Sequence, residues 1–460
     1  MLIKPKLTVS GYRAIWNKDL NESIVFEYTL AFAKMIKKYG DKNKNKILVG
    51  RDARKTGMTI LSAVEDALKK EGLEVEYVGI IPTPSVLLLV KKLSALGGII
   101  ITASHNPKEY NGLKFVMDTG LFTIQKEVNE IEEIRKNLTD EEKKYEKDTK
   151  EELQEIDNKR FREIHISEIL KHINVNLIKS KKFKVALDPI NSAGSLITQE
   201  FLKELGCEVS VINGKLNGEF AHEPEPILKN LSQICEAVSK NNSDIGFAQD
   251  PDADRLVVID EHGVFLSEEY TLALAVKNVL SKNKSDVVVN MSTSRMCEDI
   301  ANTYERKTYK TKIGEANVME KMMQIGSIIG GEGNGGVIYT KVHFSRDSLT
   351  GIGLILELMA TENKSISEII KEIEPYIMKK DKIIFSGNLE TLYWKLKNEF
   401  HDASINTEDG VRFDWPDFSW IHIRPSNTEP IIRIIGEAKN EKRINLIFDK
   451  TKSLVNKLNI

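Results

Sequence analysis

Three stretches of the chain follow the same plan of secondary structure, and this repetition limits the possible folds more than any other feature. Each has a β-branched strand, a turn of small residues, a helix of about three turns, a second strand, and a later strand that ends in a polar loop. The stretches span residues 46–107, 184–255 and 286–336. Strands that alternate with helices are typical of parallel sheets with helices on both faces. The sequence therefore predicts an α/β protein built from three related units with mixed, mostly parallel sheets.

The chain is also too long for one core, because at 460 residues it exceeds the size at which a single hydrophobic core keeps growing. After about Ser367 the α/β plan gives way to a helical segment at 369–377, short strands and a closing helix, which predict a smaller α+β domain. The charged segment 137–158 predicts a solvated helical linker with i,i+4 charge pairs. We expect four domains, at 1–150, 151–258, 259–367 and 368–460.

Polar loops follow buried strands in all three units. Ligands of open α/β sheets bind beyond the carboxyl ends of the strands. The loops TASHNP (102–107), DPDADR (250–255) and GEGNGG (331–336) are therefore expected to share one region. Ser104 lies in the first loop beside His105. A serine hydroxyl needs a base, a metal or a cationic neighbourhood to act as a nucleophile, while serine is also common in ordinary turns, so its role depends on its neighbours.

The second loop carries three carboxylates at a spacing of two: Asp250, Asp252 and Asp254. Clustered carboxylates repel one another unless a cation holds them, and oxygen ligands favour Mg²⁺ or Ca²⁺. An EF-hand loop would use the same acidic positions, with Glu261 as its twelfth residue. That loop needs glycine where this chain has Arg255, and the flanking segments predict strands rather than helices. The sequence therefore predicts a metal site on a strand–loop–strand unit.

Two further motifs predict contacts to a ligand. GEGNGG matches the dinucleotide fingerprint, but that motif requires a following helix and the next residues predict extended chain. Its glycines instead allow a ligand to approach the backbone, which leaves Glu332 and Asn334 to bond sugar hydroxyls. In the last domain, RPSNTEPIIR combines Arg424 and Arg433 with hydroxyl groups. Guanidinium forks match phosphate oxygens, so this segment predicts a phosphate cradle, with a capped turn before a strand as the alternative.

Composition excludes several classes of partner. A formal net charge of −2 argues against nucleic acid or an anionic membrane, which require a basic surface. No segment has the apolar run of a signal peptide or a membrane span. Cys207, Cys235 and Cys297 lie far apart and predict buried thiols rather than a disulfide or zinc framework. We therefore expect a cytoplasmic protein that acts on a small molecule.

Taken together and in this order, TASHNP, DPDADR, GEGNGG and RPSNTEP resemble the phosphoserine, metal-binding, sugar-binding and phosphate-binding loops of the α-D-phosphohexomutases. This family includes phosphoglucomutase, phosphomannomutase and phosphoglucosamine mutase. The resemblance covers essentially the whole chain, with further matches at SGYR (10–13), VGRDAR (49–54), PTP (82–84), NGLKF (111–115) and TKIG (311–314). It implies four domains around a central cleft that the C-terminal domain closes.

The resemblance also implies a role for each motif. Ser104 would carry the transferable phosphoryl group, and its phosphate with Asp250, Asp252 and Asp254 would hold one Mg²⁺ per chain. The other expected site residues are His105, Arg13, Lys114 and Arg255 at the reaction centre, Lys312, Glu332 and Asn334 on the sugar, and Arg424, Ser426, Asn427, Thr428 and Arg433 on the phosphate that does not react.

The implied reaction moves a phosphoryl group between O1 and O6 of a hexose phosphate through a hexose 1,6-bisphosphate, which also acts as activator. We expect a phosphomannomutase/phosphoglucomutase, with phosphoglucosamine mutase as the alternative, acting as a monomer or homodimer. A non-catalytic sugar-phosphate-binding protein and a metal-dependent phosphatase are further alternatives. Several members have a histidine, proposed as an acid/base group, where this chain has Gly336. The proton acceptor is therefore left open between Lys114 and Arg13.

Overall fold

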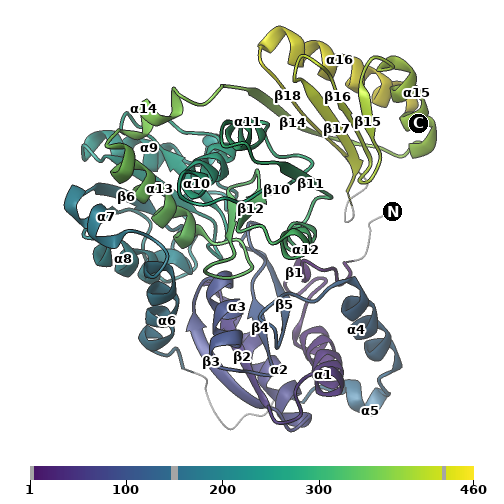
Figure 1. The fold of residues 1–460 in the computed structure, drawn as a ribbon. Helices are drawn as coiled ribbons and strands as arrows, with labels where there is room; N and C mark the ends of the chain where they lie inside the picture. Colours follow the sequence, from purple (N-terminus) through teal and green to yellow (C-terminus); the bar gives the residue numbers. More distant parts are fainter. Residues whose placement is uncertain (1–4, 147–153, 427–430, 460) are drawn as a thin grey trace.

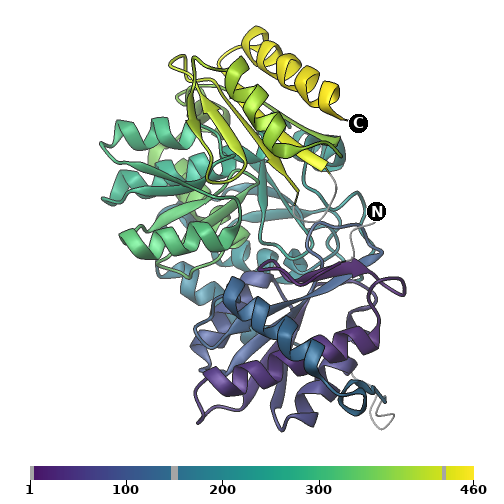
Figure 2. The same ribbon diagram turned by 90° about the vertical axis from the view of Figure 1, so that its right-hand side faces the viewer.

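Four sheets make up the protein, which is described here by a computed structural model covering residues 5–146, 154–426 and 431–459. Three sheets belong to α/β units and the fourth is antiparallel, which confirms the predicted fold class. Figures 1 and 2 show the first sheet at one end of the molecule, the fourth at the other end, and the second and third between them. The described groups expected to line a central cleft are largely buried, so no open cleft is seen at them and the cleft stays a prediction.

The three α/β sheets share one strand order, so the repetition in the sequence corresponds to repeated topology. In each sheet a central strand has a parallel neighbour on either side, and one of these neighbours continues through a hairpin into an antiparallel fourth strand. The first sheet also has β1 at its edge, paired antiparallel to β5.

The strands of the first sheet, in spatial order, are β1 (Tyr12–Ile15), β5 (Tyr110–Met117), β4 (Gly97–Ile101), β2 (Lys46–Arg51) and β3 (Glu74–Ile80). Those of the second are β7 (Glu208–Val211), β6 (Lys184–Asp188), β8 (Ile245–Gln249) and β9 (Leu256–Ile259). Those of the third are β11 (Thr308–Thr311), β10 (Val287–Asn290), β12 (Ile329–Glu332) and β13 (Gly336–Tyr339). The three polar loops of the sequence are thus equivalent hairpin loops, between β4 and β5, β8 and β9, and β12 and β13.

Helices cover both faces of these sheets, because their central strands are apolar on both sides. In β4, for example, Ile99 and Ile101 face one hydrophobic layer while Ile100 faces the other. The helices of the first unit are α1 (Glu22–Tyr39), α2 (Gly57–Lys70), α3 (Thr83–Lys92) and α4 (Gln125–Asn137). Those around the second sheet are α6 (Lys159–Leu170), α7 (Val175–Lys181), α8 (Gly194–Glu204), a 3₁₀ turn at Leu228–Asn230 and α9 (Ser232–Lys240).

The second and third units share one hydrophobic core, which fixes their loops relative to each other. The third unit contains α10 (Glu268–Lys282), α11 (Met296–Thr303), α12 (Glu315–Ile325) and α13 (Ser348–Glu362). Helix α13 is apolar and buried around its circumference, as expected of a helix packed inside a core. Together with α10 it contacts β9 of the second sheet and β13 of the third. This packing brings the DPDADR and GEGNGG loops together, and the amide of Leu256 donates to the carbonyl of Gly335 at 3.0 Å.

The fourth domain is an antiparallel sheet with helices α15 (Leu389–Glu399) and α16 (Glu441–Leu458) packed on it. Its strands, in spatial order, are β14 (Ile377–Ile384), β18 (Ile431–Ala438), β17 (Trp420–Pro425), β16 (Val411–Asp414) and β15 (Ser404–Asn406). The hydrogen bonds that join it to the third unit include those between the hydroxyl of Ser292 and the imidazole of His422 (2.9 Å), the amide of Arg295 and the carboxylate of Glu437 (2.9 Å), and the amide of Ile313 and the carboxylate of Asp409 (2.9 Å).

Two predictions of local structure were wrong. The helical segment expected at 369–377 ends early, because α14 spans only Ile366–Ile370 and β14 begins at Ile377. Pro375 explains the break, since proline cannot donate to a helix and disfavours helical geometry in the residue before it.

The charged segment 137–158 is largely exposed in its described part, as expected, but little of it is helical. Asn137 ends α4, and α5 spans only Asp140–Lys143. Near the end of the segment, Glu155 accepts from the hydroxyl of Tyr77 at 2.8 Å and pairs with Arg51. The buried side chain of Asn158 donates to the carbonyl of Ile80 at 2.7 Å. These contacts hold the segment against the first sheet.

None of the helices in the described part of the chain combines the length and apolar character that a membrane span requires. All three cysteines are free thiols. Cys207 and Cys297 are buried, as the sequence predicted, whereas Cys235 is half-buried.

Candidate active site

Ser104 occupies a strained position directly after β4. Its φ of +51° lies in the left-handed region that residues with a side chain rarely adopt, and such strain is concentrated at functional sites. The residue is only 1% exposed. Its backbone amide donates to the hydroxyl of Thr102 (2.8 Å), which in turn donates to the carboxylate of Asp52 (2.7 Å). The backbone of the serine is therefore held by hydrogen bonds from within the first unit.

Arg54 holds the rest of the serine loop. Its guanidinium is buried and pairs with Asp52 at 3.0 Å. The same group donates to four backbone carbonyls of the loop: Ser104 (2.7 Å), Asn106 (2.6 Å), Pro107 (2.6 Å) and Tyr110 (3.0 Å). Because the five N–H groups of arginine form a rigid fork, these bonds set the path of the whole loop.

The three aspartates of the second unit converge beside Ser104. One carboxylate oxygen from each of Asp250, Asp252 and Asp254 lies within 4.8 Å of the others, and all three residues are buried. The hydroxyl of Ser104 donates to Asp250 at 3.1 Å. Burial, together with the neighbouring carboxylates of Asp254 and Asp252, raises the pKa of Asp250 well above its usual range. The predicted metal loop and the predicted nucleophile therefore form one site.

The aspartate cluster fits a hard divalent cation. The Oδ1 atoms of Asp252 and Asp254 are buried and have no hydrogen-bond partner among the described residues. Buried carboxylate oxygens left unpaired are costly, and oxygen-only ligand sets suit Mg²⁺. The donor set is thus consistent with the magnesium site expected from the sequence.

Cationic side chains surround the cluster. The ammonium of Lys114, on β5, donates to Asp252 at 2.7 Å, and the hydroxyl of Thr83 donates to the same oxygen at 2.7 Å. Although burial opposes ionisation, these donors hold the pKa of Asp252 below its usual range. The Nε–H groups of Arg13 and Arg255 are buried without a hydrogen-bond partner in the described part of the chain, and that of Arg255 lies 3.9 Å from Asp254. They leave donors available for an anion at this point.

His105 lies next to the serine hydroxyl, with its Nδ1 3.3 Å from Ser104 Oγ. Burial lowers the pKa of His105 well below 6.5, and the nearby positive charges of Arg255 and Arg13 lower it further. The imidazole is therefore neutral at physiological pH. A neutral imidazole in contact with a hydroxyl can accept its proton.

The sugar loop contributes a buried carboxylate that is already hydrogen-bonded. Glu332 accepts from the side-chain amide of Asn290 (2.9 Å), the backbone amide of Gly314 (3.1 Å) and the guanidinium of Arg346 (2.7 Å). The carbonyl oxygen of the Asn334 side chain is buried and has no partner among the described residues. Lys312 is exposed on the loop after β11.

Arg346 explains why the chain has glycine at position 336. A Cβ atom on Gly336 would lie 2.2 Å from Cδ of Arg346, so no side chain, including histidine, fits there with the arginine in place. Arg346 donates to Asp254 of the metal loop (2.5 Å) and to Glu332 of the sugar loop (2.7 Å), and it pairs with Glu315 (3.2 Å). This residue joins two of the three loops, and the motifs gave no signal of it.

The expected phosphate cradle lies at the edge of the fourth domain. Arg424 on β17 and Arg433 on β18 are directly opposite each other across the sheet. The Nε–H of Arg424 is buried without a partner in the described chain, and its Nη1 lies 3.8 Å from Asp409. Burial lowers the pKa of Arg424 and the carboxylate of Asp409 opposes this effect. Asn427 and Thr428 lie outside the described residues.

Asp409 links this cradle to the sugar loops. Besides its contact with Arg424, it accepts from the amide of Ile313, next to Lys312. The structure therefore brings Arg13, His105, Lys114 and Arg255 together around Ser104 and the aspartates, links Glu332 to them through Arg346, and connects the fourth domain through Asp409. Lys312 is exposed, and its side chain forms no hydrogen bond or ion pair with the described members of this group. Sequence reasoning missed Asp409 and Arg346, and it assigned no role to Arg54 and Thr83 although both lie in motifs that it noted.

A serine held beside a buried carboxylate cluster, among unpaired cationic donors at the shared end of repeated α/β units, defines an enzyme of phosphoryl transfer. Models of the phosphoglucomutase/phosphomannomutase family match all four parts of the chain: alpha/beta/alpha domain I at 4–142, domain II at 163–263, domain III at 267–376 and the C-terminal domain at 396–453. The chain belongs to this family and is a phosphohexomutase.

Relatives of known name support the same assignment. The chain is 35% identical over 458 residues to the phosphoglucosamine/phosphogalactosamine mutase of Sulfurisphaera tokodaii, covering 97% of this chain and 98% of that protein. It is 34% identical over 437 residues to the phosphoglucomutase/phosphomannomutase of Thermococcus kodakarensis, covering 94% of each. A solved phosphoglucomutase/phosphomannomutase family protein from Burkholderia thailandensis has the same fold, with a TM-score of 0.83, 22% identity, and coverage of 100% of this chain and 98% of that one.

Proposed function

We propose that the chain moves a phosphoryl group between O1 and O6 of a hexose phosphate, with Ser104 as the carrier. The supporting observation is the position of the Ser104 hydroxyl, 3.1 Å from Asp250 and beside His105, which lies near Arg13 and Arg255. The Nε–H groups of these two arginines have no hydrogen-bond partner among the described residues. An unmodified serine leaves these buried donors without an acceptor. A phosphate on the serine would supply acceptor oxygens to them, and charge-assisted bonds of this kind are strong.

Asp250, Asp252 and Asp254 would hold Mg²⁺ together with the serine phosphate. When bound, Mg²⁺ offsets the charge that develops on the oxygens of the transferring group. The protein's own part is to place the reactants in line and to keep water out, because the site is buried. Arg13, Arg255 and Lys114 add fixed positive charge where the phosphoryl group is transferred.

For the proton-transfer step, the structure adds a candidate proton acceptor. When Ser104 attacks the bisphosphate, its hydroxyl must lose a proton. His105 Nδ1 is 3.3 Å from that hydroxyl and is kept neutral, so it joins Lys114 and Arg13 as a candidate acceptor. The ammonium of Lys114 is already engaged with Asp252 at 2.7 Å.

Arg424, Arg433 and Ser426 would bind the phosphate that does not react, with Asn427 and Thr428 expected to complete the cradle. The bisphosphate intermediate must be held in two orientations, so the distal phosphate requires a cradle that recognises phosphate alone. Paired arginines on neighbouring strands suit this task, because guanidinium groups match phosphate oxygens without contacting the sugar. Glu332, Asn334 and Lys312 would contact the sugar hydroxyls.

For the substrate, we propose the phosphates of glucose and mannose. Glucosamine phosphate is the second candidate, and the name of the Sulfurisphaera tokodaii relative favours it. The deciding experiment assays the purified full chain with the 1-phosphates of glucose, mannose and glucosamine in parallel, with Mg²⁺ and the matching 1,6-bisphosphate, and follows formation of the 6-phosphate by ³¹P NMR. The highest kcat/KM identifies the substrate. Release of inorganic phosphate instead of a 6-phosphate would show a phosphatase, and binding without turnover would contradict the proposal.

A further inference from the structure

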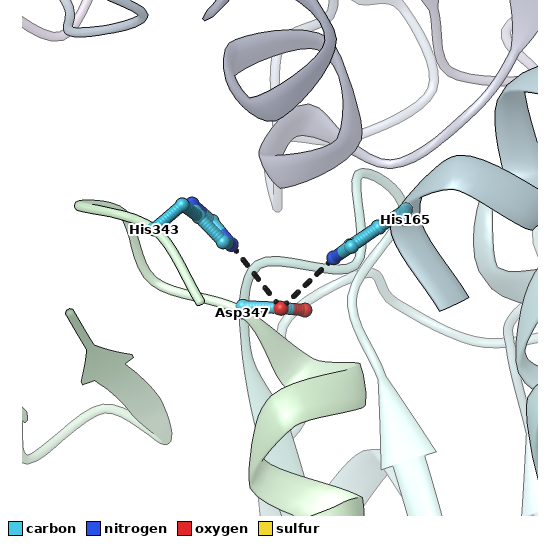
Figure 3. Close-up of side chains that lie close together, drawn as sticks. All are labelled: His165, His343 and Asp347. Carbon is cyan, nitrogen blue, oxygen red and sulfur yellow. Dashed lines mark hydrogen bonds and ion pairs between the residues drawn. The ribbon is translucent and has the colours of Figure 1, made fainter. Parts of the chain in front are cut away.

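A second group of possible metal ligands lies outside the aspartate cluster (Figure 3). His165 on α6 and His343 in the loop after β13 both point at Asp347, the residue that caps α13. The Nε2 atoms of His165 and His343 lie 3.0 Å and 3.2 Å from the same oxygen of Asp347, Oδ2. One ligand atom from each residue lies within 4.8 Å of the others. The three side chains are almost completely buried.

His165 and Asp347 are each oriented by further contacts. Nδ1 of His165 is 2.7 Å from the hydroxyl of Ser85 on α3. The other oxygen of Asp347, Oδ1, accepts from the amide of Leu349 at 3.0 Å, and Oδ2 also accepts from Thr350 at 2.5 Å. Outer partners of this kind, on the second nitrogen of a histidine and the second oxygen of a carboxylate, are typical of metal ligands.

The charge of Asp347 lacks a fixed counterion. Among the described residues, no lysine or arginine pairs with this buried carboxylate, and its only ion-pair partners are His165 and His343. A buried carboxylate requires a compensating positive charge, which must here be a proton on an imidazole or a bound cation. In addition, Nδ1 of His343 is buried without a hydrogen-bond partner in the described chain, so this imidazole is held through Nε2 on Asp347.

We propose that His165, His343 and Asp347 bind a divalent transition-metal ion of the zinc class. Two imidazole nitrogens and a carboxylate oxygen are ligands that Zn²⁺ accepts, with water in the fourth position, whereas the all-oxygen aspartate cluster suits Mg²⁺. Ligand atoms on a tetrahedral zinc ion are about 3.3 Å apart, given bonds of about 2.0–2.1 Å. The two nitrogen–oxygen separations are close to this value, so a metal ion requires only small adjustments of the side chains.

The position of the cluster gives such an ion a structural role. Asp347 follows Arg346, which contacts Asp254 of the catalytic cluster. On the other side, Ser85 lies two residues after Thr83, which donates to Asp252. A metal at His165 would therefore connect α3 of the first unit, α6 and the start of α13, directly behind the catalytic aspartates. We infer that it fixes the relative positions of the first three units.

Cobalt provides a direct test, because Co²⁺ bound tetrahedrally by nitrogen ligands absorbs visible light strongly and Co²⁺ in an octahedral oxygen site absorbs weakly. The full-length protein is stripped with a chelator, supplied with excess Mg²⁺ to occupy the aspartate cluster, and titrated with Co²⁺. We expect one strongly absorbing Co²⁺ per chain, displaced by Zn²⁺. His343→Gln should abolish the strong Co²⁺ absorption, and Ser85→Ala should weaken the affinity for Co²⁺ at least about tenfold. Asp252→Asn should leave the strong absorption unchanged.

The alternative is a hydrogen-bonded cluster whose positive charge is a proton. One result that overturns the proposal is a wild-type protein without strongly absorbing Co²⁺. The other is a strong Co²⁺ absorption that disappears in Asp252→Asn and persists in His343→Gln. The wild-type titration tests for the zinc-class site even if His343→Gln fails to fold. Phosphohexomutase turnover in wild type is a separate readout, so failure of the zinc-class site leaves the proposed function untouched.

Discussion

The guanidinium of Arg54 donates to the backbone carbonyl of Ser104 at 2.7 Å, so this arginine positions the serine that we propose as the phosphoryl carrier. The same side chain reaches three more carbonyls of the loop and pairs with Asp52, all within the first unit. The position of the serine is thus fixed before the other units contribute their charges. Phosphoryl transfer depends on such preorganisation, because the reacting atoms must be aligned.

Replacing Arg54 should therefore affect both stability and rate. Arg54→Met leaves Asp52 buried without its partner, which should cost about 3–5 kcal/mol of unfolding free energy. Arg54→Lys keeps the charge but cannot reach four carbonyls, so it should recover part of the stability and little of the activity. Urea unfolding and kcat/KM measured on both variants test this. If Arg54→Lys has wild-type turnover, the arginine does not position the serine loop.

Ser104 should carry phosphate in the active protein. Intact-protein mass spectrometry should show the mass of one phosphate on the wild type and none on Ser104→Ala. The alanine variant should also retain no more than a trace of activity. Ser167→Ala, on the exposed face of α6, is the matched control and should keep both. Equal turnover by the wild type and Ser104→Ala, with bisphosphate present, would rule out the phosphoserine mechanism.

Removal of Mg²⁺ should abolish turnover, and its return should restore it, because the aspartate cluster has unpaired oxygens. Asp252→Asn should weaken Mg²⁺ binding and lower kcat/KM at least about a hundredfold, about 2.7 kcal/mol. Asp381→Asn, which removes a surface carboxylate paired with Lys452 in the fourth domain, should change neither quantity. Isothermal titration with Mg²⁺ separates binding from rate, and full activity in excess chelator would refute the metal assignment.

The sequence predicted the parts of this site that depend on local pattern. Ser104 and the aspartates follow buried strands, Glu332 ends one, and the repeated topology gives each unit an equivalent loop. The remaining residues depend on packing between units, which no local pattern encodes. Arg346 is the clearest case. Its Cδ would lie 2.2 Å from a Cβ atom at position 336, and this contact, which only the structure reveals, explains the glycine there.

The two failures of local prediction have different origins. The segment 369–377 has helical periodicity, yet Pro375 ends the helix and Ile377 starts a strand that pairs with β18, about fifty residues later. The charged segment near Glu155 has the composition of a solvated linker, but Arg51 and Tyr77 on the first sheet provide partners for it. Contacts distant in sequence therefore decided the second case, whereas the proline in the first case is a local signal.

Docking of the fourth domain should weaken at acidic pH because of His422. Burial lowers the pKa of this imidazole from 6.5 to about 4, and its contact with Ser292 suits the neutral form. Between these values the unfolded chain binds more protons than the folded chain, so stability rises with pH through this window and is lost as pH falls from 6.5 towards 4. Between pH 7 and pH 5 the wild type should lose about 2 kcal/mol more than His422→Gln. Urea unfolding at both pH values measures the difference, and equal losses would show that His422 does not titrate in this way.

Arg424 should control both rate and retention of the intermediate. It would bind the phosphate that does not react, so its binding energy serves to orient the sugar at Ser104, and truncation should reduce kcat as well as raise KM. We expect Arg424→Ala to lose about 2–4 kcal/mol in kcat/KM, the scale of losing one partner of a charge-assisted contact. The bisphosphate must turn over while it is held, so the same variant should also release more of it into solution.

Chromatography during turnover can count the released bisphosphate. Arg443→Ala is the matched control, because this arginine lies in the same domain and pairs with Asp417 at 2.8 Å, away from Arg424 and Arg433. If Arg424→Ala equals Arg443→Ala in both rate and release, the paired arginines do not bind the distal phosphate. A loss of rate without added release would mean that Arg424 orients the substrate while other groups retain the bisphosphate, and the fourth domain would then hold the intermediate through the residues around Ser426.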